Sequence, residues 1–225
     1  VLIDADDTVC CSKQVSVWVP TDTEQSPDWL FLFYADGDNN LCPNIWRNVQ
    51  QCCTGLQNKT GSKSVKVAVL WDGSAKGSEM YKMIPPSSYL LELGAEDLSG
   101  VYYSNTLKYT DYSYTASWLT DSDGNQEVDM ADWATATRFL QWAQGRYNAK
   151  HTVFLMSDHG SGPWTDLTSS RSVCADNTSD AAHDMIQTTQ FSEMCRSAGY
   201  STTDKLDMIV LDACHTPQQA MALLR

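Results

Sequence analysis

The sequence predicts an α/β fold in which a mostly parallel sheet is flanked by helices on both faces. Short runs that are apolar throughout alternate along the chain with segments whose apolar residues recur at helical spacing. Continuous apolar runs are typical of strands buried on both faces, and strands that alternate with helices favour parallel pairing. Most of these runs also stop at a polar cluster, and folds of this class bind ligands at the carboxyl ends of their strands.

The length of 225 residues favours one large domain. We expect residues 1–28 to form an N-terminal extension and linker, with a short β-like stretch at 15–19, and residues 29–225 to form the folded domain. The chain ends soon after the last predicted strand, which would leave an apolar sheet edge uncovered. Further residues or a second chain are therefore expected to complete the sheet.

Strands and helices are expected in turn from residue 29 onward. The predicted strands occupy residues 29–34, 65–71, 151–156 and 208–211. The predicted helices occupy residues 40–53, 133–144, 185–198 and 217–224. Pro43 near the start of the first helix, and a glycine just past the end of each of the first three, are typical helix boundaries. The Tyr- and Ser-rich region 101–118 is expected to be irregular or to form a hairpin.

The charge balance narrows the classes of partner. With 28 acidic against 15 basic residues, the formal net charge is −13, which argues against nucleic acid or an anionic membrane as a partner. No apolar stretch approaches the roughly 20 residues that a membrane-spanning helix needs. The acidity suits cationic substrates or divalent metal ions, although most of the acids are expected only to solvate the surface.

Eight cysteines favour an oxidising compartment. No zinc-type CxxC pairs occur, so disulfides are the preferred interpretation. Two N-glycosylation sequons, at Asn58 and Asn177, and a first residue that is Val1 fit a processed protein that is secreted or lumenal. If Cys214 stays free for chemistry, the odd number of cysteines that remains requires a partner outside the chain or a second free thiol.

Two strand ends carry the residue types of nucleophilic catalysis. The third predicted strand leads to His159 and the fourth leads to Cys214. A cysteine attacks as its thiolate, and a nearby histidine lowers its pKa or moves its proton. The amides of Gly160 and Gly162, with the N–H of Cys214, could form an oxyanion hole. Taken singly, Cys214 also fits a structural or disulfide-bonded cysteine, and His159 fits an ordinary loop histidine. The matched strand-end positions favour catalysis.

Four segments resemble the clostripain-like cysteine peptidases, a family in the clan of caspases, gingipains and legumain. In the order and spacing of that family they are WLFLFYADGDNNL, VKVAVLWDG, NQEVDMADWATATRFLQWAQGRYNAKHTVFLMSDHGSG and MIVLDACHT. The resemblance covers residues 29–53, 65–73 and 125–220. It implies a caspase-like fold with His159 and Cys214 as the catalytic dyad, Gly160 as a contributor to the oxyanion hole and Asp212 as an acid of the S1 pocket.

A role for Asp212 in substrate binding also has a physical basis. It stands two residues before Cys214 and so points to the same side of an extended chain. Its carboxylate could receive a substrate guanidinium or ammonium group through charged hydrogen bonds worth about 1.5–3 kcal/mol. This favours cleavage after Arg or Lys. The terminal Arg225 is the residue that such a cut would leave, and the family is often matured by self-cleavage.

A second group of oxygen-bearing side chains lies in the segment DSDGNQEVDMAD, residues 121–132. Their spacing resembles a calcium-binding loop. The residues concerned are Asp121, Asp123, Asn125, Glu127, Asp129 and Asp132. The glycine falls earlier than in such a loop and the last acid is Asp instead of Glu, so Asp129 and Asp132 also fit helix-capping residues. Members of the family often depend on calcium, which makes calcium the candidate cofactor.

These observations favour a secreted cysteine endopeptidase that cleaves peptide bonds after Arg or Lys. Cys214 would attack the scissile carbonyl, His159 would supply the proton to the leaving group, and Asp212 would hold the basic P1 residue. Two alternatives remain open. A catalytically silent structural or adhesive extracellular protein could retain the same fold, and a calcium-binding module could serve mainly in assembly. A Cys214 found in a disulfide would favour the silent protein.

Overall fold

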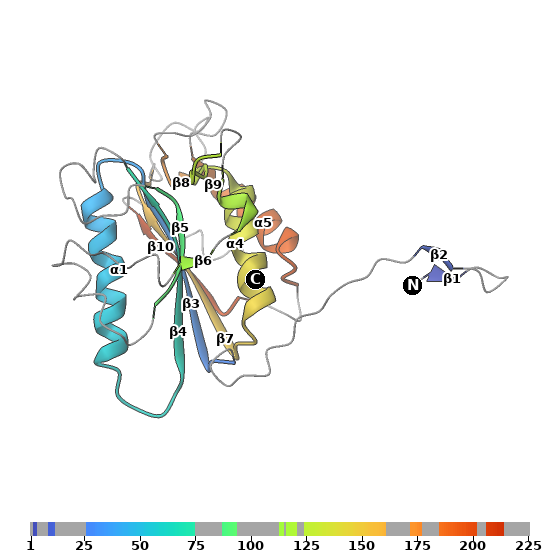
Figure 1. Ribbon diagram of the computed structural model, residues 1–225, viewed down its shortest axis with the longest axis horizontal. Coiled ribbons are helices and arrows are strands. Elements are labelled where there is room, and N and C mark those ends of the chain that lie inside the picture. Colours follow the sequence, from blue (N-terminus) through green and yellow to red (C-terminus); the bar gives the residue numbers. More distant parts are fainter. Residues whose placement is uncertain are drawn as a thin grey trace.

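The structure is a computed structural model that describes residues 2–3, 9–11, 26–74, 87–93, 113–114, 116–120, 124–160, 172–176, 185–201 and 206–213. Its centre is a six-stranded sheet with the strand order β10-β7-β3-β4-β5-β6 (Figure 1). In chain order these strands are β3 (Trp29–Gly37), β4 (Val65–Gly73), β5 (Tyr89–Leu93), β6 (Ser113–Tyr114), β7 (His151–Asp158) and β10 (Met208–Ala213).

Four adjacent strands of the sheet are parallel, as the sequence predicts. β10 pairs with β7, β7 with β3 and β3 with β4, all in parallel. They contain the four strands that the apolar runs predict, each longer by a few residues. Because the strands run in the same direction, their carboxyl ends meet at one edge of the sheet. We call this edge the carboxyl rim; it comprises residues 36–40, 72–74, 157–160 and 212–213.

β5 and β6 extend the sheet with antiparallel pairs. Leu90 of β5 lies opposite Leu70 of β4 on one side and opposite Tyr114 of β6 on the other. β5 was not predicted from the sequence, because Glu92 interrupts its short apolar run. Within residues 101–118 the described part forms β6 and the first residues of the 3₁₀ turn η3 (Ser117–Leu119), and the irregular or hairpin-like form expected for this region stays a prediction.

Helices cover both faces of the sheet (Figure 1). α1 (Cys42–Gln57) lies on one face, and α4 (Trp133–Arg146) and α5 (Phe191–Ser197) lie on the other. α1 carries Pro43 in its first turn, where the missing N–H costs no hydrogen bond. α4 is capped by Asp132, whose carboxylate accepts a hydrogen bond of 2.9 Å from the N–H of Ala134. The first two predicted helices are thereby confirmed.

Side chains along the strands alternate between two cores. Leu32, Tyr34 and Phe154 pack with Phe139 of α4, whereas the intervening residues of β3, such as Phe33, pack against α1. This alternation follows from the period of two along a strand. Burial of each large apolar side chain contributes about 1.5–3 kcal/mol. The same alternation decides which face of the sheet each polar residue of the carboxyl rim occupies.

The predicted helix over residues 185–198 is only partly correct. Its first residues form β9 (Ile186–Gln187), which pairs antiparallel with β8 (Ser172–Val173), and the 3₁₀ turn η4 (Thr188–Gln190) precedes α5. The side chain of Gln190 accepts a 2.8 Å hydrogen bond from the N–H of Gln187. Such a local side-chain bond competes with the helical one, and Ile186 is buried in the core from a strand instead of a helix.

Several predictions at the ends of the chain lie outside the described residues. They are the β-like stretch at 15–19 and the helix at 217–224. Near the N-terminus, β1 (Leu2–Ile3) pairs antiparallel with β2 (Val9–Cys11). The division into an extension of residues 1–28 and a domain of residues 29–225 stays a prediction. No helix in the described part has both the length and the apolar character that a membrane crossing needs.

The predicted disulfides are not confirmed for the cysteines whose side chains the structure describes. Cys42, Cys52, Cys174 and Cys195 are free thiols. Cys42 and Cys53 pack in the core beneath α1, while Cys174 and Cys195 belong to the opposite face, so the sheet separates the two groups. The side chains of Cys10, Cys11 and Cys214 are outside the described part. Of the two sequons, Asn58 is exposed after α1 and Asn177 is not described.

A cluster of ionic groups ties β4, β5 and α4 together. Glu92 accepts hydrogen bonds from Lys66 at 3.0 Å and from Arg146 at 3.3 Å, and another from the hydroxyl of Tyr147. Burial by itself raises the pKa of Glu92, but the hydrogen bonds from Tyr147 and Lys66 together with both cations outweigh it, and the net pKa lies below the ordinary 4.5. The charged carboxylate is thus the form that this cluster stabilises.

Candidate active site at the carboxyl rim

The rim brings together three of the four residues predicted to act on a substrate. His159 and Gly160 follow β7 directly, and Asp212 lies in the neighbouring strand β10. Their roles stay predictions. Cys214 lies outside the described residues. The pairing of β10 with β7 is described as far as Ala213, which lies opposite Asp158, the residue before His159.

The imidazole of His159 is held from the side of α1. Its Nε2 lies 2.8 Å from Oδ1 of Asn40, which precedes α1. An amide oxygen can only accept, so this bond requires a proton on Nε2 and leaves Nδ1 as the acceptor of a neutral ring. The carbonyl of His159 accepts a 3.2 Å hydrogen bond from the N–H of Cys174, and Gly160 forms an isolated bridge with Val173. Hydrogen bonds therefore hold both the side chain and the backbone of His159.

Asp212 presents an exposed carboxylate at the same edge of the sheet. It lies opposite Ser157, whose hydroxyl donates a 2.9 Å hydrogen bond to Oδ2. The amide of Asn48 in α1 donates a second bond to the same oxygen at 3.2 Å. Asp212 thus faces α1, and its two neutral donors orient the carboxylate without cancelling its charge. Such a group can bind a cation.

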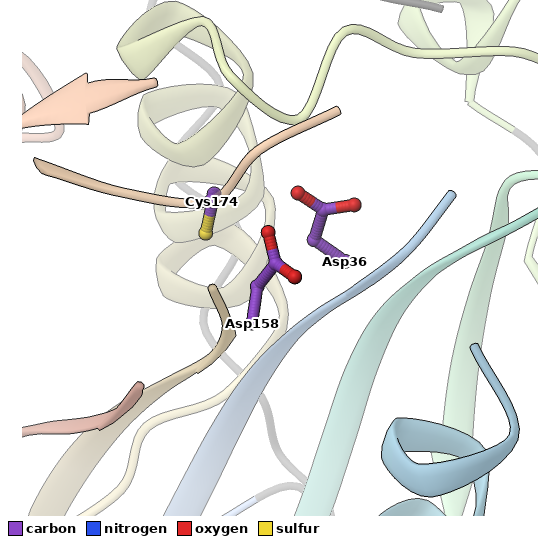
Figure 2. A group of neighbouring side chains, drawn as sticks. All are labelled: Asp36, Asp158 and Cys174. Atoms are coloured by element: carbon purple, nitrogen blue, oxygen red, sulfur yellow. The ribbon is translucent and has the colours of Figure 1, made fainter. Parts of the chain in front are cut away.

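The opposite face of the rim holds acids of a different kind. Asp36 of β3, Asp72 of β4 and Asp158 of β7 are buried on the side of α4. Cys174 lies beside Asp36 and Asp158 (Figure 2). Burial raises the pKa of Asp36 and of Asp72 well above the ordinary value, and the neighbouring carboxylates raise it further. Burial also raises the pKa of Asp158. Burial likewise raises the pKa of the Cys174 thiol well above its ordinary value.

The predicted calcium loop over residues 121–132 is described only from Gly124 onward, so Asp121 and Asp123 lie outside the described residues. Asp129 accepts hydrogen bonds from the N–H groups of Ala131 at 2.9 Å and Asp132 at 3.1 Å. Asp132 itself caps α4, as the alternative interpretation expects. Asn125 is exposed and Glu127 is half-buried. Calcium binding by this loop stays a prediction.

Sequence reasoning missed the groups that orient the predicted residues. Asn40, Asn48 and Ser157 carry no motif of their own, and only the fold brings them to His159 and Asp212. The signal for Asn40 was its place at the start of the predicted helix over residues 40–53. The contact of Asp36 with Asp158 and Cys174 was not foreseen.

Comparison with known proteins places this arrangement in a family. The Clostripain family profile matches residues 33–219. A secreted C11 cysteine protease from Bacteroides thetaiotaomicron, solved with an irreversible peptide inhibitor, is similar at 16% identity and a TM-score of 0.52. The B. thetaiotaomicron protease iotapain, also described as a secreted C11 cysteine protease, is similar at 15% identity and a TM-score of 0.52. An inactive zymogen C11 protease from Parabacteroides distasonis is similar at 18% identity and a TM-score of 0.52.

The three similarities cover 84%, 84% and 87% of this chain but 43%, 46% and 43% of the solved chains. The chain therefore spans less than half the length of the proteins whose fold it shares. No curated protein matches the sequence. At these identities the solved structures bear on the fold alone, and they confirm the predicted caspase-like sheet flanked by helices. Because the family profile matches most of the sequence, the chain belongs to the clostripain family of cysteine peptidases.

Proposed function

We propose that this chain carries the catalytic residues of a secreted cysteine endopeptidase that cleaves peptide bonds after Arg or Lys. The observation that carries the proposal is the arrangement of β7 and β10 at the rim. His159 leaves β7 with Nε2 bonded to Asn40, and β10 pairs with β7 up to Ala213, one residue before Cys214. Neighbouring strands lie about 4.8 Å apart, so a nucleophile that follows β10 directly is within reach of this imidazole.

In the proposed reaction the thiolate of Cys214 attacks the scissile carbonyl and forms an acyl-enzyme. The bond from Nε2–H to Asn40 leaves Nδ1 of His159 to take the thiol proton and to deliver it to the leaving amine. Water then attacks the thioester, with His159 as the base. The N–H groups of Gly160 and Cys214 are the proposed donors to the oxyanion.

The proposed preference for Arg or Lys rests on Asp212. Its carboxylate is exposed, and its two described hydrogen-bond donors, Ser157 and Asn48, are both neutral. A substrate guanidinium can therefore approach without displacing a protein cation. Charged hydrogen bonds of this kind contribute about 1.5–3 kcal/mol, which corresponds to roughly 10–100-fold in binding.

Secretion, maturation by self-cleavage and a second chain or further residues that complete the sheet belong to the same proposal. Secretion is supported by the similarity to a protease described as secreted. The strand order supports completion of the sheet, since β10 has a partner on one side only within the described residues. An unpaired strand edge is a site for further pairing.

Peptide cleavage by the full-length protein tests the proposal. Reporter peptides with Arg, Lys or Asp at P1 should be offered to the wild type, to Cys214→Ala and to the matched control Cys195→Ala, with and without a chelator. We expect cleavage after Arg and Lys, loss in Cys214→Ala and retention in Cys195→Ala. The chelator arm tests the dependence on calcium. Unchanged activity in a folded Cys214→Ala variant rejects the dyad.

Labelling separates the peptidase from a catalytically silent protein. A chloromethyl ketone with Arg at P1 should alkylate Cys214 in the wild type and leave Cys195 untouched, as read by peptide mass mapping. Replacement of His159 by Ala should slow this labelling. A Cys214 found in a disulfide with another cysteine would instead favour the structural or adhesive role.

A further inference from the structure

We propose that Asp36, Asp158 and Cys174 form a binding site for a thiophilic divalent cation of the Zn²⁺ type on the α4 side of the carboxyl rim. The two carboxylates and the Cys174 sulfur lie within 4.8 Å of one another (Figure 2). The exposed fractions of the three residues are 0%, 2% and 0%, so the group is sealed from solvent. Within the described residues this is the one such group of three His, Cys, Asp or Glu side chains.

Three separate segments converge to build the group. Asp36 is the last residue but one of β3, Asp158 ends β7, and Cys174 follows β8. Asp158 is oriented by the amide of Asn39, which donates a 2.7 Å hydrogen bond to Oδ1, and by the N–H of Ala175, which bonds Oδ2. Cys174 has a φ of 64°, the left-handed region that non-glycine residues rarely occupy. The carboxylate of Asp158 is therefore oriented before any cation binds.

Asp36 is the observation that points to a ligand. Its side chain is completely buried, yet neither carboxylate oxygen has a hydrogen-bond partner. Figure 2 shows its carboxylate facing that of Asp158. Two carboxylates that face each other in a dry site repel unless a shared proton or a bound cation lies between them. A buried polar atom without a partner destabilises the fold, and a buried charge does so more strongly.

The surroundings of the group add negative charge and no described cation. Five aspartates are buried at or beside the rim: Asp36, Asp38, Asp72, Asp158 and Asp176. One oxygen of Asp38 and one of Asp72 also lack a hydrogen-bond partner. No lysine or arginine is buried in the part of the chain that the structure describes. A bound dication would offset this charge where no described side-chain cation does.

The sulfur selects the class of cation. Ca²⁺ takes six to eight oxygen ligands and Mg²⁺ takes an octahedron of oxygens, whereas Zn²⁺ is held by combinations of Cys sulfur, His nitrogen and carboxylate oxygen. Two carboxylates and one thiolate fit the third set and leave one position of a tetrahedron open. On binding, Cys174 would lose its thiol proton to solvent. This site differs in place and in chemistry from the predicted calcium loop at residues 121–132.

A cation here would stiffen the base of the proposed active site without entering it. Cys174 donates its N–H to the carbonyl of His159, and Asp158 precedes His159 directly. The ligands nevertheless face α4, whereas Asn40 and Asp212 lie on the side of α1. The cation is therefore structural in this proposal. Its test reads metal content and spectra, which do not depend on peptide cleavage.

The test uses the full-length protein purified without chelator. Elemental analysis is expected to find about one Zn²⁺ per chain in the wild type. After removal of zinc, added Co²⁺ should give a thiolate-to-cobalt charge-transfer band, and X-ray absorption at the zinc edge should show one sulfur among oxygen or nitrogen neighbours. A coordination sphere with oxygen alone, or a wild type that neither holds nor binds zinc, overturns the proposal.

Variants of the proposed ligands, compared with control variants, show which residues bind the zinc. Asp36→Asn and Cys174→Ser should lose the zinc and the cobalt band, and Asn39→Ala should weaken zinc affinity by about 10–100-fold because it orients Asp158. Cys195→Ser, Cys214→Ser and Asp207→Asn should retain both signals, which excludes the other thiols and an exposed carboxylate. A cobalt band that survives in Cys174→Ser, or a thermal shift given by Ca²⁺ and not by Zn²⁺, would contradict the assignment. If a variant fails to fold, the wild-type absorption spectrum still decides.

Discussion

The two faces of the carboxyl rim use polar groups in opposite ways. On the side of α1, His159 and Asp212 are accessible, and each has a neutral hydrogen-bond partner that fixes its orientation. On the side of α4, Asp36 and Asp158 are buried with the thiol of Cys174, and Asp36 has no hydrogen-bond partner. The first arrangement suits contact with a substrate, and the second suits a bound cation. Alternation along β7 produces both, since successive residues point to opposite faces.

The ionic cluster around Glu92 shows a half-buried acid of this protein whose charge is neutralised by neighbouring side chains. Glu92 has Lys66, Arg146 and Tyr147 as partners, and its net pKa is lowered. Asp36 has no such partner, and its pKa is raised, first by burial and then by Asp158. The contrast indicates that the rim acids are not held for stability by the described side chains alone.

The largest expected effect is the loss of peptide cleavage when His159, on the α1 side of the carboxyl rim, is replaced. His159→Ala should lower kcat/KM for an Arg reporter by about 10,000-fold, because the nucleophile loses its proton acceptor. The measurement is steady-state cleavage by the full-length protein, with circular dichroism to confirm folding. His151→Ala is the control, since this exposed histidine lies at the other end of β7 and should leave the rate unchanged. Equal loss in both variants would contradict a special role for His159.

The next largest effect concerns charge selection on the α1 side. Asp212→Asn should lower kcat/KM for Arg and Lys reporters by about 10–100-fold, because a charged hydrogen bond becomes a neutral one. The isosteric change keeps an oxygen for the donors Ser157 and Asn48. Reporters with a neutral P1 residue should be much less affected. A uniform loss over all P1 residues would mean that Asp212 supports the fold instead of specificity.

A smaller effect is expected for the residue that positions the imidazole. Asn40→Ala removes one hydrogen bond to His159 and should lower kcat by about 10-fold with little change in KM. Asn40→Asp should instead favour the imidazolium, since it places a carboxylate beside the ring, and shift the acid limb of the pH–rate profile upward. A pH profile that is unchanged in Asn40→Asp would show that the residue does not act through the ring.

The smallest expected effect is a change in stability when Glu92, the acid that has cationic partners, is replaced. Glu92→Gln should lower the free energy of unfolding by about 1 kcal/mol at neutral pH, because the pairs are partly exposed and screened. The pKa of Glu92 is depressed in the folded state, so its contribution is present above the ordinary pKa of 4.5 and is lost as pH falls through the folded value. Urea titrations at pH 7 and pH 3 measure this. The difference between wild type and variant should shrink at pH 3, and a difference that grows there would refute the assignment.

Much of the fold could be predicted because its signals are local. The apolar runs at 29–34 and 151–156 indicate buried strands, and the glycine after residue 144 marks the end region of α4. The prediction of secondary structure failed where a short segment fits both a helix and a strand. Ile186 fits the spacing of a helix, but its pairing with Val173 makes it part of a strand. β5 was missed because the charged Glu92 interrupts its apolar run.

By itself, the sequence determined the class of fold, the family and the strand ends at which His159 and Asp212 stand. The spacing of apolar residues, the glycines and prolines that end elements, and the family motifs can all be recognised within short stretches of sequence. Only the tertiary structure decided what those residues contact. Asn40 and His159 are 119 residues apart, as are Asn39 and Asp158, and their contacts exist because β3 and β7 are neighbours in the sheet. The face on which each acid is buried follows from strand register, and a shift of one residue would exchange the two faces.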